Sequence, residues 1–508
     1  GPIPFLSTID ADMTAYRQGK TRKGSYAAYI DIDHPDILEF ISIRVPTGDN
    51  NRKCLNLHNA VNITDSFMEA VKEGRTYELI DPKKGSTGEF LDARKVFIKL
   101  LETRFRTGEP YLNFIDTAND ALPQELKDKG FSCCIGGIPE VSEEKKLEYL
   151  TPLQLRGFNS TSILYGCMAG IDAWKDAGFS IDENSILDYD SGLIFGTGTS
   201  GIEKFRESIY KIDEQKVRRL GSTSVVQTMA SGISAYLGGI LGFGNQVTTN
   251  SSACTTGTEA LLLGFERIKN GKAKRMLVGS SSDSSLYTWG GFDAMRVTTY
   301  KHNETPEKGS RPMSETASGF VPGSGAGALV LESLESALER KATIYAEVLG
   351  GNINSGGQRK GGTLTAPNSE AVQKCITDAL LDSGISSTEI DVINGHLTAT
   401  SKDALEIESW SNALQRKESD FPYINSLKSM VGHCLAGAGA IESVASVLQI
   451  KEQFIFPNIN CEDIHSEISE LIDAQKIPMK MIEKDIHIVA KASFGFGDVN
   501  ACVIFKKY

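Results

Sequence analysis

The chain has 508 residues, of which 40% are hydrophobic and 23% charged, and its formal net charge is −12. This length predicts two or more domains, the composition is typical of a soluble globular protein, and the negative charge argues against broad nucleic-acid binding. No stretch has the ~18 consecutive apolar residues of a membrane-spanning helix, and the first residues lack a leader pattern. Nine cysteines at irregular spacing favour a reducing compartment, so we expect a cytoplasmic protein without membrane contact.

Residues 1–130 predict an α/β fragment to which the residues alone assign no chemistry. An alternating run over residues 25–32 predicts a strand, and a proline-initiated helix start follows within 34–40. The two histidines of this region, His34 and His58, have no partner at a spacing typical of metal or acid–base sites.

Several stretches of this region resemble the catalytic large subunit of ribonucleotide reductase. They are Gly1-Pro-Ile-Pro-Phe-Leu6, Arg17-Gln-Gly-Lys-Thr-Arg-Lys-Gly24, Asp33-His-Pro-Asp-Ile-Leu-Glu-Phe40, Asn62-Ile-Thr-Asp-Ser-Phe-Met68 and Gly108-Glu-Pro-Tyr-Leu-Asn-Phe-Ile-Asp116. The Asn-x-Cys-x-Glu motif that carries the radical chemistry of that family is absent, and Cys54 does not belong to such a motif. The resemblance therefore implies an α/β fragment of the reductase barrel that is not catalytic.

From residue 131 the chain alternates between strand and helix patterns, which predicts a layered α/β domain. The predicted strands are 192–196, 246–249, 275–278, 326–331, 344–348, 390–393, 423–426, 488–492 and 501–505, and the main helical patterns are 369–383, 402–414 and 435–452. The pattern runs in two similar halves, which indicates an internal duplication. We therefore predict halves at 131–335 and 336–508.

The turn Val247-Thr-Thr-Asn-Ser-Ser-Ala-Cys254 joins a predicted strand to a helix with apolar residues at Leu261, Phe265 and Ile268. A cysteine at a helix N-terminus is favoured as the thiolate, because backbone N–H groups and the helix dipole stabilise negative charge. Small neighbours leave room for another molecule to approach the sulfur. This turn predicts a nucleophilic Cys254.

Three motifs in the second half end strands in the same way, at the places where α/β folds gather active sites. They are Asn394-Gly-His396-Leu-Thr398-Ala-Thr400-Ser-Lys-Asp403-Ala-Leu-Glu406, Lys428-Ser-Met-Val-Gly-His433 and Ser493-Phe494-Gly-Phe496-Gly-Asp498-Val-Asn500. Of the seven histidines, His396 and His433 are the two in such settings.

These four motifs, in this order, resemble the β-ketoacyl-acyl carrier protein synthases, and the two histidines indicate the elongating Cys-His-His type. The resemblance implies a thiolase-like αβαβα layered sandwich with internal duplication, preceded by the fragment of a ribonucleotide-reductase-like barrel. It implies a homodimer and a decarboxylative Claisen condensation of an acyl thioester with malonyl-acyl carrier protein, in fatty acid or polyketide synthesis. Neither a metal nor a cofactor is expected, since the substrates arrive on the phosphopantetheine arm of the carrier.

The resemblance also implies residue roles. Cys254, His396, His433 and Lys428 are the catalytic set, and the backbone N–H groups of Cys254 and Phe496 form the oxyanion hole. Thr398 and Thr400 bind phosphopantetheine, Phe494 and Phe496 form the gate, and Glu406 is a structural acid. The residues implied in docking the acidic carrier protein are Arg296, Arg156, Arg218 and Arg219.

The sequence departs from the synthase pattern in three places. Leu397 and Asp498 stand where the family usually has glycine, and Asp498 would bring a negative charge near the thiolate. The opening strand is replaced by residues 1–130, and we expect that strand to lie inside its sheet. We therefore expect either that a foreign segment, residues 26–32 or 111–115, fills the place or that the first half is poorly ordered. Two alternatives to an active synthase stay open: a non-functional fusion product, and a non-catalytic partner of the chain-length-factor kind.

Overall fold

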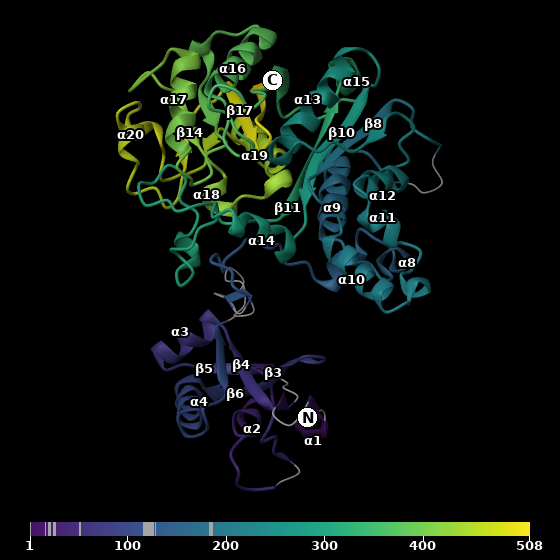
Figure 1. The fold of residues 1–508 in the computed structure, drawn as a ribbon, viewed down its shortest axis with the longest axis vertical. Coiled ribbons are helices and arrows are strands. Elements are labelled where there is room, and N and C mark those ends of the chain that lie inside the picture. Colours follow the sequence, from purple (N-terminus) through teal and green to yellow (C-terminus); the bar gives the residue numbers. More distant parts are fainter. Residues whose placement is uncertain are drawn as a thin grey trace. The chain divides into compact units, whose positions relative to one another are not determined.

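The computed structural model describes residues 2–15, 17–18, 22–23, 27–49, 52–114, 126–127, 129–181 and 186–508. The chain divides into an N-terminal unit, Gly1–Pro123, and a C-terminal unit, Gln124–Tyr508 (Figure 1). The domain limits predicted at 130, 131–335 and 336–508 stay predictions. Among the described helices, none combines the length and the apolar character that a membrane crossing requires.

The N-terminal unit is built on a parallel three-stranded sheet in the order β3-β4-β7. β3 lies within the predicted strand 25–32, and α2 follows the predicted helix start. A core of its own, which includes Ile30, Phe40, Val61 and Leu100, holds the sheet against the helices. The elements are α1 Ile3–Ala15, β1 Arg17–Gln18, β2 Arg22–Lys23, β3 Ala27–Asp31, α2 Ile37–Ile41, β4 His58–Ile63, α3 Asp65–Glu73, β5 Thr76–Asp81, β6 Gly85–Asp92, α4 Ala93–Thr107 and β7 Tyr111–Phe114.

The first half of the C-terminal unit holds a four-stranded sheet in the order β11-β10-β8-β9. β10, β8 and β9 are parallel and β11 is antiparallel to β10. The elements of this half are α7 Glu143–Leu147, α8 Pro152–Leu155, α9 Thr161–Asp176, β8 Ser191–Thr197, α10 Ile202–Asp213, η2 Val217–Arg219, α11 Ser224–Thr228, α12 Gly232–Leu241, β9 Val247–Thr248, η3 Ala253–Thr255, α13 Thr256–Lys269, β10 Arg275–Ser282, α14 Leu286–Ala294, η4 Pro306–Lys308, β11 Gly325–Glu332 and α15 Leu334–Glu339.

The second half holds a five-stranded sheet in the order β12-β18-β17-β13-β14. Its elements are β12 Glu347–Ser355, α16 Ser369–Ser383, η5 Ser387–Glu389, β13 Val392–Asn394, α17 Asp403–Leu414, β14 Tyr423–Asn425, α18 Lys428–Val431, η6 Leu435–Gly437, α19 Ala438–Glu452, β15 Phe454–Ile455, α20 Ser466–Ser469, η7 Ala474–Lys476, β16 Ile482–Glu483, β17 Ile488–Gly495 and β18 Val499–Lys506. The predicted helix 369–383 is confirmed as α16. The predicted strand 344–348 begins later, at Glu347, because its pairing with β18 begins there, and the pairing continues through a glycine-containing segment to Ser355.

The two sheets enclose a central layer of helices. α13 and α19 lie between the sheets, α9 and α12 cover the outer face of the first sheet, and α16 and α17 cover that of the second (Figure 1). Glycines permit the close approach of the central pair, since a Cβ at Gly439 would lie 2.6 Å from Thr258 N, and one at Gly257 would overlap Ala440 N. The result is the predicted αβαβα sandwich.

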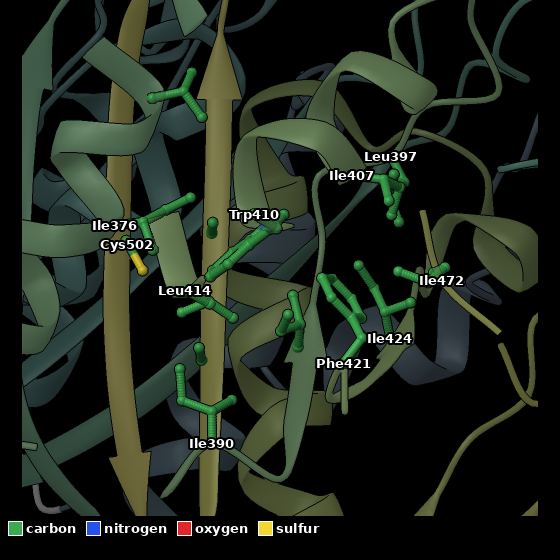
Figure 2. Close-up of a cluster of buried hydrophobic side chains, with 14 of the residues drawn as sticks. Ile376, Ile390, Leu397, Ile407, Trp410, Leu414, Phe421, Ile424, Ile472 and Cys502 are labelled. Atoms are coloured by element: carbon green, nitrogen blue, oxygen red, sulfur yellow. The ribbon is translucent and has the colours of Figure 1, made fainter. Parts of the chain in front are cut away.

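The outer core of the second half accounts for one departure from the family pattern. Trp410, Phe421 and Leu414 are fully enclosed between the second sheet and its outer helices (Figure 2). Leu397 lies in this core beside Ile407 rather than in the space around Cys254 (Figure 2). The larger side chain at this position is therefore accommodated by packing.

The duplication shows where the first sheet differs from the second. β8, β10 and β11 are paired as β13, β17 and β18 are, and β12 is the extra strand at the edge beside β18. Its counterpart would lie at the edge beside β11. The expectation that the missing strand lies inside the sheet is wrong, because the interior positions are taken by β8 and β10.

The expected substitution by a foreign strand is also wrong for the residues that the structure describes. β3 and β7, the described parts of the two candidate segments, both pair with β4 inside the N-terminal unit. Tyr26 and Ile115, at the ends of these segments, lie outside the described residues. Among described strands β11 pairs with β10 alone, and an edge strand costs far less than an empty interior place because its outer groups can reach water.

Candidate active site

Cys254 lies in the short helix η3, at the start of α13. The preceding residue, Ala253, has φ +49°, a left-handed conformation that is rare for a residue with a side chain. Leu435 has the same φ at the start of η6, before α19. The two halves of the duplication thus present equivalent turns at the N-termini of the two central helices, and one of them carries the cysteine.

Burial decides the protonation of Cys254. Removal from water raises the pKa of the thiol to about 11, although Lys428 and the backbone N–H groups of Phe496 and of Cys254 itself lower it. The predicted stabilisation of the thiolate by backbone N–H groups is present, but desolvation of the charged form outweighs it. The same N–H groups show that Phe496 and Cys254 direct two donors toward the sulfur.

His396 and His433 face the cysteine from two different motifs. His396 follows β13 and His433 lies between α18 and η6. Their nearest nitrogens and the Cys254 Sγ all lie within 4.8 Å of one another. The imidazole rings are 5.4 Å apart and nearly perpendicular, at 83°. The structure thus brings together the three residues that the sequence placed in separate motifs.

Both imidazoles are neutral near pH 7. Burial, followed by the charge of Lys428, holds the pKa of each well below 6.5, and Lys491 lowers both further. The backbone N–H of Leu435 donates to His433 Nδ1 over 3.2 Å, so the proton of the neutral ring is on Nε2. His396 Nδ1 is buried and has no hydrogen-bond partner in the described part of the chain.

Two carboxylates shape the loop that carries His396. Glu406 accepts hydrogen bonds from the backbone N–H groups of His396 (2.7 Å) and Leu397 (2.8 Å). Asp403 accepts from the N–H groups of Thr398 (2.9 Å) and Ala399 (3.1 Å). Burial raises the pKa of Glu406 to about 7, with Asp403 as the next cause. Both acids therefore bind backbone N–H groups of this loop.

Lys428 belongs to a buried cluster of three charges. Its Nζ binds Glu442 Oε1, and Lys491 Nζ lies 2.7 Å from Glu442 Oε2. Lys491 also donates to Ala492 O (2.6 Å) and to Ser493 Oγ (2.7 Å). Sequence reasoning missed Glu442 and Lys491. The available signal was a lone charge in each of two mainly apolar or small-residue stretches: Lys491 is the one charged residue of β17, and Glu442 stands apart from the charges at the end of α19. Such isolated charges predict a buried pair.

The three side chains open into a cavity of about 240 Å³. Thr398 and Thr400 line it, and their hydroxyls are 3.1 Å apart. Phe494 lies with its ring 6.4 Å from that of His396, and Phe496 lies 5.9 Å from Phe292. The lining also includes residues that the sequence did not single out: Phe292, Val297, Phe320, Thr365, Ala366, Pro367 and Ser369.

The arginines implied in docking lie elsewhere. Arg296, Arg156, Arg218 and Arg219 are all exposed, and none is among the described residues that line the cavity.

The thiol and the two imidazoles could also be ligands for zinc, which cysteine and histidine commonly bind. The surroundings oppose this, because Lys428 and Lys491 place two ammonium groups close to the same imidazoles. The expectation that the site works without a metal stays a prediction.

A buried thiol beside two neutral imidazoles, inside a duplicated αβαβα sandwich, places the C-terminal unit among the thiolase-like condensing enzymes. Residues 158–337 match the family Beta-ketoacyl synthase, N-terminal domain, and residues 345–462 match Beta-ketoacyl synthase, C-terminal domain. The Putative 3-oxoacyl-[acyl-carrier-protein] synthase, mitochondrial, of Schizosaccharomyces pombe is 31% identical over 382 residues, which cover 73% of this chain and 88% of that protein. The chain belongs to the beta-ketoacyl synthase family, and it is a condensing acyltransferase.

A solved structure agrees with this assignment. A Beta-ketoacyl synthase from Burkholderia phymatum STM815 superimposes with a TM-score of 0.69 at 26% identity, and the match covers 76% of this chain and 91% of that one. The predicted thiolase-like fold is confirmed.

The N-terminal residues match a different family. Residues 1–131 match Ribonucleotide reductase, barrel domain. The Putative ribonucleoside-diphosphate reductase large subunit of Frog virus 3 (isolate Goorha) is 62% identical over 130 residues, which cover 26% of this chain and 23% of that protein. The predicted reductase-like fragment is confirmed, and the chain spans about a quarter of that relative.

Proposed function

We propose that the chain catalyses the decarboxylative condensation of an acyl thioester with a malonyl thioester carried by acyl carrier protein. One observation supports this most directly: the Cys254 thiol and two neutral imidazoles meet within 4.8 Å and line one cavity. A nucleophile with two neutral donors suits a reaction that first forms an acyl-enzyme and then an enolate.

In the first step, Cys254 Sγ attacks the acyl carbonyl carbon. The carrier thiol leaves and takes up the proton that the cysteine loses, while the N–H groups of Cys254 and Phe496 stabilise the oxyanion. Because the thiol is protonated at rest, its proton must depart as the new carbon–sulfur bond forms. Lys428 assists by lowering the pKa of the thiol.

In the second step, the bond between the malonyl carboxylate and its neighbouring carbon breaks and carbon dioxide leaves. The electron pair stays as an enolate, whose oxygen accepts hydrogen bonds from His396 and His433. The enolate carbon then attacks the acyl-enzyme, the carbon–sulfur bond breaks, and a proton from solvent restores the thiol. Neutral imidazoles suit this role because each can donate a hydrogen bond from its N–H without a permanent charge.

The remaining roles follow from position. Thr398 and Thr400 would bind the phosphopantetheine arm, since both residues line the cavity, and Phe494 and Phe496 would form its gate. Arg296 and the other exposed arginines would bind the acidic carrier, whose charge requires a local basic patch on this acidic chain. We further propose a homodimer, no bound cofactor or metal, and a cytoplasmic location.

The two alternatives are less well supported. A chain-length-factor-like partner would lack the nucleophile, whereas Cys254 is present and lies beside both histidines. A non-functional fusion would be expected to damage the site, yet the unpaired edge is on β11 and no cavity-lining residue comes from that strand.

The test is to incubate the full chain with an acyl-acyl carrier protein and to measure the mass of the Cys254 peptide. We expect acylation in the parent chain and in Cys375→Ala, which removes another buried cysteine, and none in Cys254→Ala. The Cys254→Ala variant should still decarboxylate malonyl-acyl carrier protein. In the His396→Ala and His433→Ala variants, the decarboxylation rate should fall by a factor of about 10²–10³ each. Full condensation by Cys254→Ala would overturn the proposal.

A further inference from the structure

Asp498 is a buried carboxylate in the loop that follows Phe496. Its side chain is 1% exposed and its φ is +62°. A left-handed conformation is costly for most side chains, although aspartate tolerates it better than most. A buried carboxylate also requires hydrogen-bond partners, so the contacts of Asp498 indicate why an acid stands in this loop.

The carboxylate binds the backbone of one neighbouring segment, residues 356–368. Oδ2 accepts a hydrogen bond from Gln358 N and Oδ1 accepts one from Asn368 N, each over 2.9 Å. The Asp498 carbonyl accepts from Gly356 N over 2.9 Å, and Gly497 N donates to the Leu364 carbonyl over 2.8 Å. Four hydrogen bonds therefore join the Phe496 loop to this segment. Both oxygens of the carboxylate are therefore bound by backbone N–H groups of this segment.

Two glycines make room for the carboxylate. A Cβ at Gly362 would lie 2.6 Å from Asp498 Oδ2, and a Cβ at Gly356 would overlap the same oxygen. Both positions are therefore restricted to glycine as long as Asp498 keeps this conformation. The segment and the acid are fitted to each other.

The two joined segments are walls of one cavity. Thr365, Ala366 and Pro367 line it from the 356–368 segment, and Phe494 and Phe496 line it from the Phe496 loop and the strand before it. We call the four hydrogen bonds between the segment and the loop the clamp. Asn368, whose N–H is bonded by Asp498, also caps α16 through its own Oδ1, which accepts from Glu370 N. The gate loop is thereby tied to the N-terminus of a long, well-packed helix.

We propose that Asp498 is a positioning residue that fixes the opening of the cavity and so makes the enzyme selective for short acyl chains. The inference rests on the proposed function of Cys254. The cavity of about 240 Å³ is smaller than the ~300–1,000 Å³ of typical ligand sites. The acyl group must share this volume with the phosphopantetheine arm, because Thr398 and Thr400 line the same cavity. A long acyl chain therefore requires the two walls to separate, and the four hydrogen bonds oppose that separation.

Two variants of the full chain test the clamp. Asp498→Gly removes both carboxylate bonds at a position where glycine is unstrained, whereas Asp498→Asn keeps the shape and one acceptor. The control is Asp391→Gly, because Asp391 also binds two backbone N–H groups, those of His487 and Ile488, and lies outside the cavity lining. The probes are butyryl and dodecanoyl thioesters of phosphopantetheine, with acylation of Cys254 followed by mass.

In Asp498→Gly we expect faster hydrogen exchange at the Gln358 and Asn368 amides, and at least about a tenfold fall in the butyryl-to-dodecanoyl rate ratio, the scale of one charge-assisted bond. Asp498→Asn should lie between, and Asp391→Gly should keep the parent ratio. Unchanged exchange, or faster exchange with the parent ratio, would overturn the inference. If the parent chain takes up neither acyl group, the proposed function fails and the selectivity fails with it, while the exchange rates still report whether the clamp exists.

Discussion

Lys491 and Glu442, which are 49 positions apart in the sequence, form a buried ion pair with 2.7 Å between Nζ and Oε2. Glu442 binds Lys428 through its other oxygen, so a single carboxylate neutralises one of two ammonium groups. The excess positive charge lies close to the imidazoles of His396 and His433. This cluster joins the stability of the central layers to the electrostatics of the site.

Glu442→Gln should destabilise the C-terminal unit strongly. The change leaves two buried lysines without a counter-charge, and breaking a buried ion pair from one side costs about 3–5 kcal/mol. Urea unfolding measures the difference. Glu370→Gln, which breaks an exposed pair with Lys360, should change the free energy of unfolding by less than about 1 kcal/mol. Equal effects of the two substitutions would contradict the buried cluster.

Lys491→Met should make the decarboxylation of malonyl-acyl carrier protein more sensitive to acid. Lys491 lowers the pKa of both imidazoles, so its removal raises both, and each ring becomes protonated at a higher pH. Once the lysine is gone, the nearby carboxylates of Glu442 and Glu406 also favour the protonated form of the two rings. The acid limb of the pH–rate profile should therefore move to higher pH, while Lys451→Met, at the surface, should leave the profile in place.

Alkylation of Cys254 by iodoacetamide should increase with pH up to a pKa of about 11. The thiolate is the reactive form, so below that pH the rate should rise about tenfold per pH unit. Peptide mass spectrometry follows this cysteine separately from Cys133, whose thiol has a pKa of about 12. A plateau near pH 7 would show that the helix N-terminus outweighs burial after all.

Arg296→Glu should weaken binding of the acyl carrier protein, and the loss should shrink as salt is added because exposed charges are screened. Acylation by a small phosphopantetheine thioester should continue at the parent rate, since this side chain does not line the cavity. Arg296→Gln, which removes the charge without reversing it, should have a smaller effect. Equal loss with carrier and with the small thioester would indicate misfolding instead of docking.

Residues 124–508 expressed alone should fold. The melting temperature of this fragment should lie within about 2–4 °C of that of the C-terminal unit in the full chain, a difference equivalent to ~1 kcal/mol. The reason is that each unit has its own core and the described strands of the N-terminal unit pair with one another. Differential scanning calorimetry on the fragment and the full chain measures this. An aggregated or unfolded fragment would mean that residues 1–123 complete the synthase fold.

The sequence by itself determined the alternating elements, the two-family composition of the chain and the motifs around Cys254, His396 and His433. These features are set by local signals: hydrophobic periodicity, β-branched runs and glycines at turns act between residues that are close in the sequence. The helix α16 is an example, because Asn368 caps its start and Gly384 ends it. Short motifs that end strands could likewise be assigned to one site.

Only the tertiary structure decided that burial raises the pKa of the Cys254 thiol and that Lys428 and Lys491 share Glu442. It also decided what Leu397 and Asp498 contact, and that the missing strand would lie at the edge of the first sheet. Desolvation depends on which elements enclose a group, and an ion pair between residues 49 positions apart depends on how β17 packs on α19. Neither is encoded in neighbouring residues. For the same reason, the acid in the gate loop could be noticed in the sequence, but its two glycines and its backbone partners could be identified only in the folded chain.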